Sequence, residues 1–237
     1  MKQSEQALEN NLVQQLDTLG YEFVKISNER ELKNNLKAQL EKHNNTSLTE
    51  KEFERILNHL NKGNVFDRAE TLRDRFQLTK DDGTVAYIQF LNQEHWCQNQ
   101  YQVTQQITIE GTYKNRYDVT LLINGLPLVQ IELKRRGLEL KEAFNQINRY
   151  QHHSFWASSG LFQYVQIFII SNGVNTKYFA NNKKQHFKQT FYWADQNNNK
   201  ITKLESFAES FLEKCHLSKM ICKYIVLHQS DKILMVL

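Results

Sequence analysis

Proline and cysteine are scarce in this chain of 237 residues, which has one proline and three cysteines. The cysteines, at positions 97, 215 and 222, are too few and too scattered for a disulfide framework, and none lies in a zinc-finger spacing. No apolar run reaches the roughly 18 residues that a membrane span needs, and the first residues are too polar for a signal peptide. We therefore expect a cytoplasmic globular protein.

A glycine-rich phosphate loop of the form GxxxxGK[ST] is also missing, so we do not expect this chain to hydrolyse ATP by itself. The remaining composition is ordinary for a globular protein, with 40% hydrophobic and 24% charged residues. The net charge of +4 permits nucleic-acid binding but does not argue for it, because many proteins with other partners share this balance.

Apolar periodicity divides the chain near residue 84. Before that point apolar residues recur every three to four positions, which predicts helices over 4–19, 29–42, 49–61 and 67–77 and a short strand over 21–24. Thr49 and Glu52 form a capping box for the third helix. Later the period shortens to two, which predicts strands over 85–90, 101–109, 116–123, 128–134, 164–170, 176–179 and 186–193. Helices are expected over 138–152 and 203–215.

This order of elements predicts one α/β domain, in which a central mixed β-sheet is flanked by helices. Residues 1–83 form a helical N-terminal region joined to a core over 84–218, and residues 219–237 lie beyond that core.

Two charged residues share one face of the strand that we expect over 128–134. Apolar and polar residues alternate there, so Ile131 and Leu133 face the core and Glu132 and Lys134 emerge side by side on the other face. Asp118 lies on the preceding strand, and it faces the same side as Glu132 and Lys134 only if the two strands pair in one of two alternative registers. A two-residue loop at Asn124-Gly125 would turn its carboxylate to the wrong face, whereas a three-residue loop, or a bulge with Gly at the left-handed position, would bring it to Glu132. The site therefore predicts an odd-numbered loop, and a two-residue turn with no bulge nearby would contradict it.

Two carboxylates and a lysine suit the hydrolysis of a phosphodiester bond. Carboxylate oxygens bind Mg²⁺, which acidifies a bound water and polarises the phosphate. A neighbouring lysine orients the nucleophile and offsets developing charge. The same residues would also fit a solvated strand face with an ion pair across it, worth at most about 1 kcal/mol.

Several short sequence motifs around this pattern resemble the nuclease core of the R subunit of type I restriction enzymes, and they occur in the order found in that family. They cover most of residues 4 to 228. The motifs are Ser4-Glu5 with Leu8-Glu9, Leu19-Gly20-Tyr21, Arg116–Val119, Asn124–Val129, Ile131–Arg135, Ala143–Tyr150, Ser159–Phe162 and Ile170–Gly173.

The resemblance implies a PD-(D/E)xK restriction-endonuclease-like fold and Mg²⁺-dependent cleavage of double-stranded DNA. Asp118 and Glu132 would then bind the metal, and Lys134 would position or activate the water. Tyr117 stands where the family name has proline, which leaves the acid untouched.

The resemblance also suggests residues around this centre. Gln146 and Tyr150 match a Q-x(3)-Y motif and lie on one helix face, where they would contact DNA or support the site; the alternative is an ordinary partly buried helix face. Glu5 and Glu9 are candidates for a further metal-binding acid on the first helix, of which we favour Glu9, although either also fits a solvated surface. Arg135 would follow DNA phosphates or end the strand in solvent.

R subunits of this family are longer than this chain and carry a helicase-like motor, which uses ATP, after the nuclease domain. Residues 219–237 would then be a linker toward that absent motor, and the methylation and specificity subunits of a type I complex would be partners. Two alternatives stay open: a non-catalytic module that binds DNA or docks subunits, and a nuclease of the same fold that acts alone.

Overall fold

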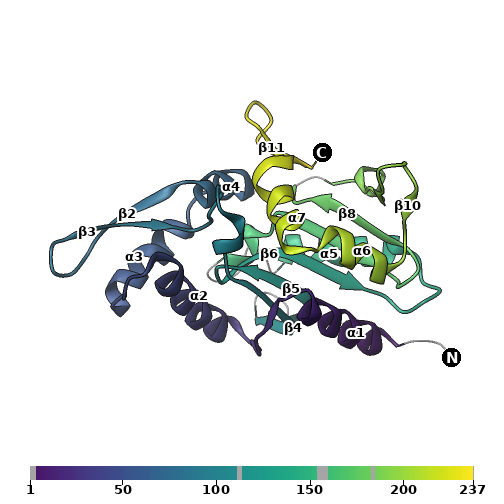
Figure 1. Cartoon of the computed structure of the whole chain (residues 1–237), viewed down its shortest axis with the longest axis horizontal. Coiled ribbons are helices and arrows are strands. Elements are labelled where there is room, and N and C mark those ends of the chain that lie inside the picture. The colour runs from purple at the N-terminus through teal and green to yellow at the C-terminus, as the bar shows by residue number, and fades with distance from the viewer. Residues whose placement is uncertain (1–3, 111–113, 154–159, 183–184, 237) are drawn as a thin grey trace.

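The structure is a computed structural model that describes residues 4–110, 114–153, 160–182 and 185–236. A mixed six-stranded sheet forms its centre, with the strand order β1-β4-β5-β6-β7-β8 (Figure 1). β1 pairs with β4 and β6 with β7 in parallel, and the other neighbours are antiparallel. The strands are β1 (Glu22–Phe23), β4 (Tyr101–Glu110), β5 (Lys114–Ile123), β6 (Leu126–Leu133), β7 (Ile167–Ser171) and β8 (Thr176–Ala180). The expected α/β class with a mixed central sheet is confirmed.

Helices shield this sheet, and the central strand β6 is buried along its whole length. A strand with no exposed residue is covered on both faces, which explains its nearly continuous apolar sequence. The helices are α1 (Glu5–Thr18), α2 (Glu29–Asn44), α3 (Glu50–Leu60), α4 (Val65–Arg73), α5 (Leu140–His153), α6 (Leu204–Phe211) and α7 (Lys214–Lys219). None of the helices in the described part of the chain combines the length and apolar character that a bilayer span requires.

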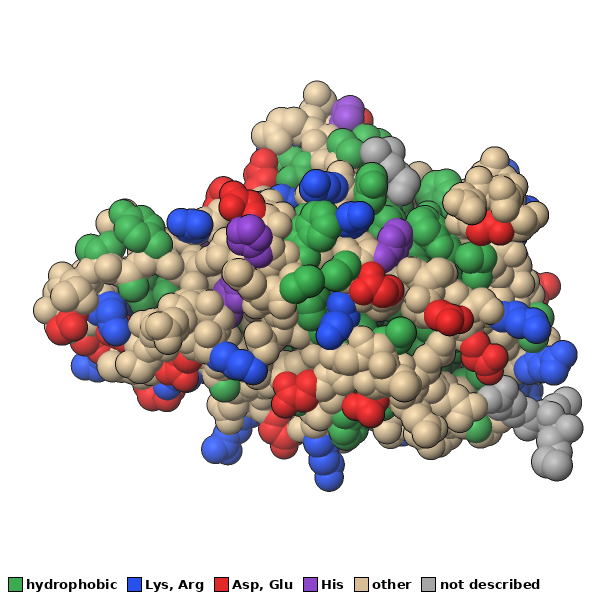
Figure 2. Space-filling view, viewed as in Figure 1, with side chains coloured by type: hydrophobic (Ala, Val, Ile, Leu, Met, Phe, Trp, Pro, Cys, Tyr) green, Lys and Arg blue, Asp and Glu red, His purple; other side chains and the backbone are tan. Residues whose placement is uncertain are grey.

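The N-terminal helices begin where the sequence places their caps. The Ser4 side chain accepts a hydrogen bond from the Ala7 N–H, and Thr49 and Glu52 form the expected capping box. The hairpin of β2 (Arg75–Thr79) and β3 (Val85–Gln89) projects from the body (Figure 1). Apolar side chains lie on its surface in Figure 2, and Tyr87 is 63% exposed.

Four predicted elements were wrong in their bounds. The helix over 67–77 ends at Arg73, because Arg75 pairs with Gln89 in the β2–β3 hairpin. The strand over 164–170 begins only at Ile167, because Leu161–Tyr164 form a 3-10 turn. The helix over 203–215 is two helices, since the Glu213 side chain caps α7 by accepting from the N–H groups of Cys215 and His216.

The strand over 186–193 is replaced by the 3-10 helix η3 (Phe187–Gln189), a bridge between Phe191 and Tyr178, and β9 (Trp193–Ala194). Local hydrogen bonds compete with the sheet here, because the Gln189 side chain accepts from the His186 N–H. The remaining elements are the 3-10 helices η1 (Trp96–Gln98) and η2 (Leu161–Tyr164), the π-helix η4 (Met220–Tyr224), and the strands β10 (Lys200–Ile201), β11 (Ile225–His228) and β12 (Ile233–Val236).

A two-residue turn joins β5 to β6. Its residues, Asn124 and Gly125, both have positive φ, at 51° and 81°, as a type I′ turn requires. The register then shifts, because Leu122 pairs with Pro127 whereas Leu121 pairs with Val129. Leu128 is therefore one extra residue in β6, and Pro127, which has no N–H to donate, occupies the irregular part of the ladder.

This bulge sets the face on which Asp118 lies. Beyond it Val119 pairs with Ile131, so the next position brings Asp118 opposite Glu132. The odd-numbered loop expected from the sequence is not found, because the turn has two residues. A bulge at Leu128, and not at the glycine, supplies the change of register instead.

Gly125→Ala should lower the free energy of unfolding by more than the backbone strain of a positive φ alone would cost. A Cβ at Gly125 would lie 2.7 Å from the Leu36 Cα in α2, so strain and a backbone clash combine. Gly83 has a φ of +85° but no heavy atom within 4 Å of such a Cβ, which makes Gly83→Ala the matched control. We expect losses of about 1 kcal/mol at Gly83 and about 3 kcal/mol at Gly125 in urea denaturation. Equal losses would contradict this close approach of the turn to α2.

Candidate active site

Asp118 lies where β5 and β6 separate. The ladder between these strands ends at Val119 and Ile131, and one residue further the Asp118 Oδ2 accepts a hydrogen bond of 2.7 Å from the Leu133 N–H. The carboxyl group thus takes the place of a strand carbonyl and is tied to the β6 backbone. The backbone ladder between β5 and β6 gives way here to this contact between a side chain and the backbone.

Glu132 and Lys134 meet Asp118 at this point. Glu132 is fully buried, and its Oε1 accepts a hydrogen bond of 2.9 Å from the Lys134 Nζ. The same Nζ donates to the Leu133 carbonyl at 3.1 Å, so the ammonium group is held on two sides. The Glu132 Oε2 is buried, and no N–H or hydroxyl group of the described residues donates to it. The carboxyl groups of Glu132 and Asp118 lie close enough to interact with each other as a side-chain pair.

Burial and the neighbouring charges shift the pKa of each of these three groups. Burial, and then the charge of Asp118, raise the pKa of Glu132 well above its usual range. Burial also raises the pKa of Asp118, although the Leu133 N–H and Lys134 act against it. For Lys134 burial would lower the pKa, but Glu132 and Asp118 outweigh it, so the pKa is raised and the amine stays charged. Two acids compete for one lysine.

Glu9 and Glu5 approach the same acids from α1. Glu9 is only 3% exposed, and burial and the charge of Asp118 raise its pKa. The Glu5 Oε1 accepts a hydrogen bond of 3.1 Å from the Arg135 N–H, and its charge contributes to the raised pKa of Asp118. The alternative of a solvated surface residue does not describe Glu9, which lies buried against the sheet.

Gln146 and Tyr150 form a short hydrogen-bonded chain on α5. The Gln146 Nε2 donates to the Tyr150 hydroxyl, which donates to the Arg116 carbonyl at 3.0 Å. Burial, and then the charge of Glu132, raise the pKa of Tyr150, so the phenol stays protonated. The pair is therefore near the acids and tied to β5, close to Asp118. Arg135 is exposed directly after Lys134.

Gln106 of β4 was missed by the sequence argument. Its Nε2 donates hydrogen bonds to the Glu9 Oε2 at 2.9 Å and to the Gln6 Oε1 at 2.6 Å. Its φ is +58°, in the left-handed region that residues other than glycine seldom adopt. No sequence signal marks it, because glutamine has no preference for this conformation.

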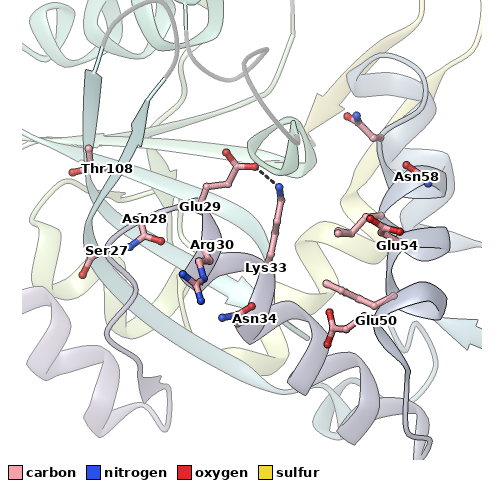
Figure 3. A pocket seen from close by; sticks show the side chains of 13 residues that line it. Ser27, Asn28, Glu29, Arg30, Lys33, Asn34, Glu50, Glu54, Asn58 and Thr108 are labelled. Carbon is pink, nitrogen blue, oxygen red and sulfur yellow. Dashed lines mark ion pairs between the residues drawn. The ribbon is translucent and has the colours of Figure 1, made fainter.

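A cleft lies elsewhere, between the start of α2 and α3 (Figure 3). It encloses about 1110 Å³ and contains none of the predicted site residues. Acidic and basic side chains both line it, and Glu29 forms an ion pair of 2.7 Å with Lys33. Acidic and basic side chains are also interspersed over the face shown in Figure 2. Neither cleft size nor surface charge therefore locates the site, which is defined by its buried acids.

The donor set fits a hard divalent cation. Both carboxyl groups are buried, the charge of Asp118 raises the pKa of Glu132, and one buried oxygen of Glu132 lacks an N–H or hydroxyl donor among the described residues. A cation bound there would neutralise the excess negative charge. Among the described residues, no group of three or more His, Cys, Asp or Glu side chains is already arranged to hold a metal ion. The fit thus rests on Asp118 and Glu132, which agrees with the few protein carboxylates that Mg²⁺ usually takes.

Comparison with known families identifies the class of this protein. The family model described as type I restriction enzyme R protein N terminus matches residues 2–187. This match covers more than half of the chain, which therefore belongs to that family.

Curated relatives agree with this assignment. The chain is 49% identical to the endonuclease subunit of a type I restriction enzyme from Staphylococcus saprophyticus, with 98% of this chain and 25% of that protein aligned. It is 39% identical to the EcoprrI endonuclease subunit from Escherichia coli, with 98% of this chain and 77% of that protein aligned. The chain thus spans about a quarter of the length of the staphylococcal relatives that it matches.

Proposed function

We propose that this chain is the nuclease region of a type I restriction R subunit, that its sheet is a PD-(D/E)xK fold, and that it hydrolyses DNA phosphodiester bonds with Mg²⁺ in the cytoplasm. One observation carries the proposal. Asp118, Glu132 and Lys134 converge at the end of the β5–β6 ladder, and the two carboxyl groups interact with each other. The Glu132 Oε2 is buried without an N–H or hydroxyl donor among the described residues. The family match and the names of the relatives support the same activity.

Each of the three residues has a distinct part in this proposal. Mg²⁺, when bound, supplies a Lewis acid and an acidified water. Asp118 and Glu132 provide carboxylate oxygens from two strands, and the Leu133 N–H fixes the orientation of Asp118. Lys134 keeps a positive charge because its two hydrogen bonds hold it beside the acids, so it can orient a water and offset charge on the phosphate.

The surrounding residues support this geometry. Gln146 and Tyr150 hold the Arg116 carbonyl on β5, two residues before Asp118, and the neutral phenol adds no negative charge to the site. Arg135 is exposed beside Lys134 and would contact a DNA phosphate. The charge of Asp118 raises the pKa of Glu9, which makes Glu9 a candidate for a further acid.

The substrate in this proposal is double-stranded DNA, and the partners are the methylation and specificity subunits of a type I complex. ATP hydrolysis would need a motor region outside these residues, since this chain has no phosphate loop. In this proposal residues 1–83 form the helical region, residues 84–218 the nuclease core and residues 219–237 a linker.

Lys134→Ala in the full-length R subunit, assembled with its partner subunits, should abolish DNA cleavage. We expect a loss of at least about a hundredfold, because the charge that stabilises the phosphate is removed. Lys141→Ala, which changes an exposed lysine on α5, is the control and should cleave as the unchanged complex does. Gel assays of circular plasmid DNA would measure this.

Full cleavage by the Lys134→Ala complex would refute the proposal. DNA binding that is independent of Mg²⁺, together with no cleavage by the unchanged complex, would identify a docking module instead. Vigorous cleavage by the isolated chain would indicate a nuclease that acts alone.

A further inference from the structure

Gln106 has an unusual backbone at a significant place in the sheet. On either side of it Gln105 pairs with Val119 and Ile107 pairs with Tyr117, so its position is opposite Asp118. The register is the same before and after Gln106, and no residue has been inserted. Its left-handed φ of +58° is therefore not the by-product of a bulge. Strained backbone of this kind persists where other contacts hold it, and it is common at functional sites.

The Gln106 side chain uses this conformation to reach α1. Its amide nitrogen donates to the Glu9 Oε2 at 2.9 Å and to the Gln6 Oε1 at 2.6 Å, on one face of the helix. Both Nε2 protons are thereby engaged. The Gln106 amide thus links β4, which pairs with the Asp118 strand β5, to α1, which carries Glu9.

Glu9 is only 3% exposed, so its carboxylate has little water to bind it. The Gln106 amide supplies a donor to its Oε2 at 2.9 Å. Removing a donor from a buried polar group is costly, so without the amide the Glu9 carboxylate would lose the contact that fixes its position.

We infer that Gln106 is a positioning residue that holds the Glu9 carboxylate beside Asp118, so that Glu9 acts as a third acid toward the divalent cation. This inference rests on the proposed function, which needs only Asp118 and Glu132. It explains why β4 adopts a left-handed residue opposite the catalytic aspartate, since a regular strand would point this side chain elsewhere.

Mg²⁺ binding to the whole chain, measured by isothermal titration calorimetry, tests this role without an activity assay. Glu9→Gln and Gln106→Gly should each weaken binding about tenfold, as is typical when a group supporting a metal ligand is removed. The double variant should also lose only about tenfold, because both changes remove one interaction. A purely structural role for Gln106 would leave the affinity unchanged.

Glycine is the informative replacement because it accepts a positive φ without strain. Gln106→Gly should therefore keep its melting temperature within about 3 °C of the unchanged chain. Asn198→Gly, at another left-handed residue with a φ of +61°, lies in an exposed turn and should not alter Mg²⁺ affinity. Gln106→Met, which keeps the side-chain length but lacks the amide, gives the same test without glycine.

The outcomes separate this inference from the proposed function. If the unchanged chain binds no Mg²⁺, or if Asp118→Asn binds it unchanged, the metal site itself is wrong. If Asp118→Asn loses binding while Glu9→Gln and Gln106→Gly keep it, only the role of Gln106 is overturned. Losses that multiply to about a hundredfold in the double variant would show that Gln106 does not act through Glu9.

Discussion

Asp118→Asn in the assembled R subunit should lower DNA cleavage by about a thousandfold or more. The change removes one negative charge from the proposed metal site, where charge stabilisation is worth several kcal/mol. The remaining amide oxygen can still accept the hydrogen bond from the Leu133 N–H, so β5 and β6 should keep their arrangement. Rates of plasmid linearisation at several Mg²⁺ concentrations would measure the loss.

Asp17→Asn is the matched control, because Asp17 is an exposed acid at the end of α1, away from the acidic cluster. It should cleave at the unchanged rate. ATP hydrolysis and DNA binding by the Asp118→Asn complex should persist, which would separate a lost catalytic site from a failed assembly. Cleavage within tenfold of the unchanged complex would remove Asp118 from the site.

Glu132→Gln should stabilise the metal-free chain at neutral pH although it destroys cleavage. The pKa of the buried Glu132 is raised well above its usual 4.5, so the folded chain holds it ionised only at a cost. Glutamine keeps the shape and an oxygen for the Lys134 Nζ but carries no charge. We expect a gain of about 1–2 kcal/mol, the size usual when a functional group that destabilises a fold is removed.

The pH dependence follows from the same shift. Because the folded pKa of Glu132 lies above the unfolded value, the folded chain binds more protons than the unfolded chain at pH values above about 4.5. The free energy of unfolding of the metal-free chain should therefore fall as the pH rises above 4.5, until the folded pKa is passed. The raised pKa of Asp118 acts in the same direction. Glu132→Gln should flatten this decline.

Thermal unfolding in chelator and in Mg²⁺ would measure both effects. In chelator at neutral pH, Glu132→Gln should melt about 3–6 °C higher than the unchanged chain. Mg²⁺ at tenfold its dissociation constant should stabilise the unchanged chain by about 1.4 kcal/mol and leave the variant unaffected. Two results would contradict the proposal that Glu132 destabilises the metal-free chain and binds the cation. One is a lower melting temperature of Glu132→Gln than of the unchanged chain in chelator, and the other is an equal stabilisation of both by Mg²⁺.

The sequence predicted those features of the site that depend on local patterns. Alternation over residues 128–134 placed Glu132 and Lys134 together, and the need for an odd register predicted the irregularity that Leu128 supplies. The Thr49 capping box follows the same logic, since its partners lie within one turn. The roles of Asp118, Glu132 and Lys134 in catalysis, and of Gln146, Tyr150 and Arg135 in support, stay predictions.

What the sequence could not give depends on contacts between distant segments. Glu9 looks like any acid on an amphipathic helix, and only the packing of α1 on the sheet shows that it is buried near Asp118. The sequence pattern does not mark Gln106 for a similar reason, because its side chain makes its contacts with α1, which is distant in the sequence. The false strand over 186–193 shows that apolar alternation also fails where local hydrogen bonds compete with the sheet.

Anomalous diffraction from crystals of this chain soaked in Mn²⁺ tests the central claim most directly. The account predicts an anomalous peak between the carboxyl groups of Asp118 and Glu132, with oxygen ligands near 2.1–2.2 Å by analogy with the short bonds of Mg²⁺. The peak should vanish in Asp118→Asn crystals grown in the same way. A well-ordered site without such a peak at saturating Mn²⁺, or a peak that lies only elsewhere, would contradict it.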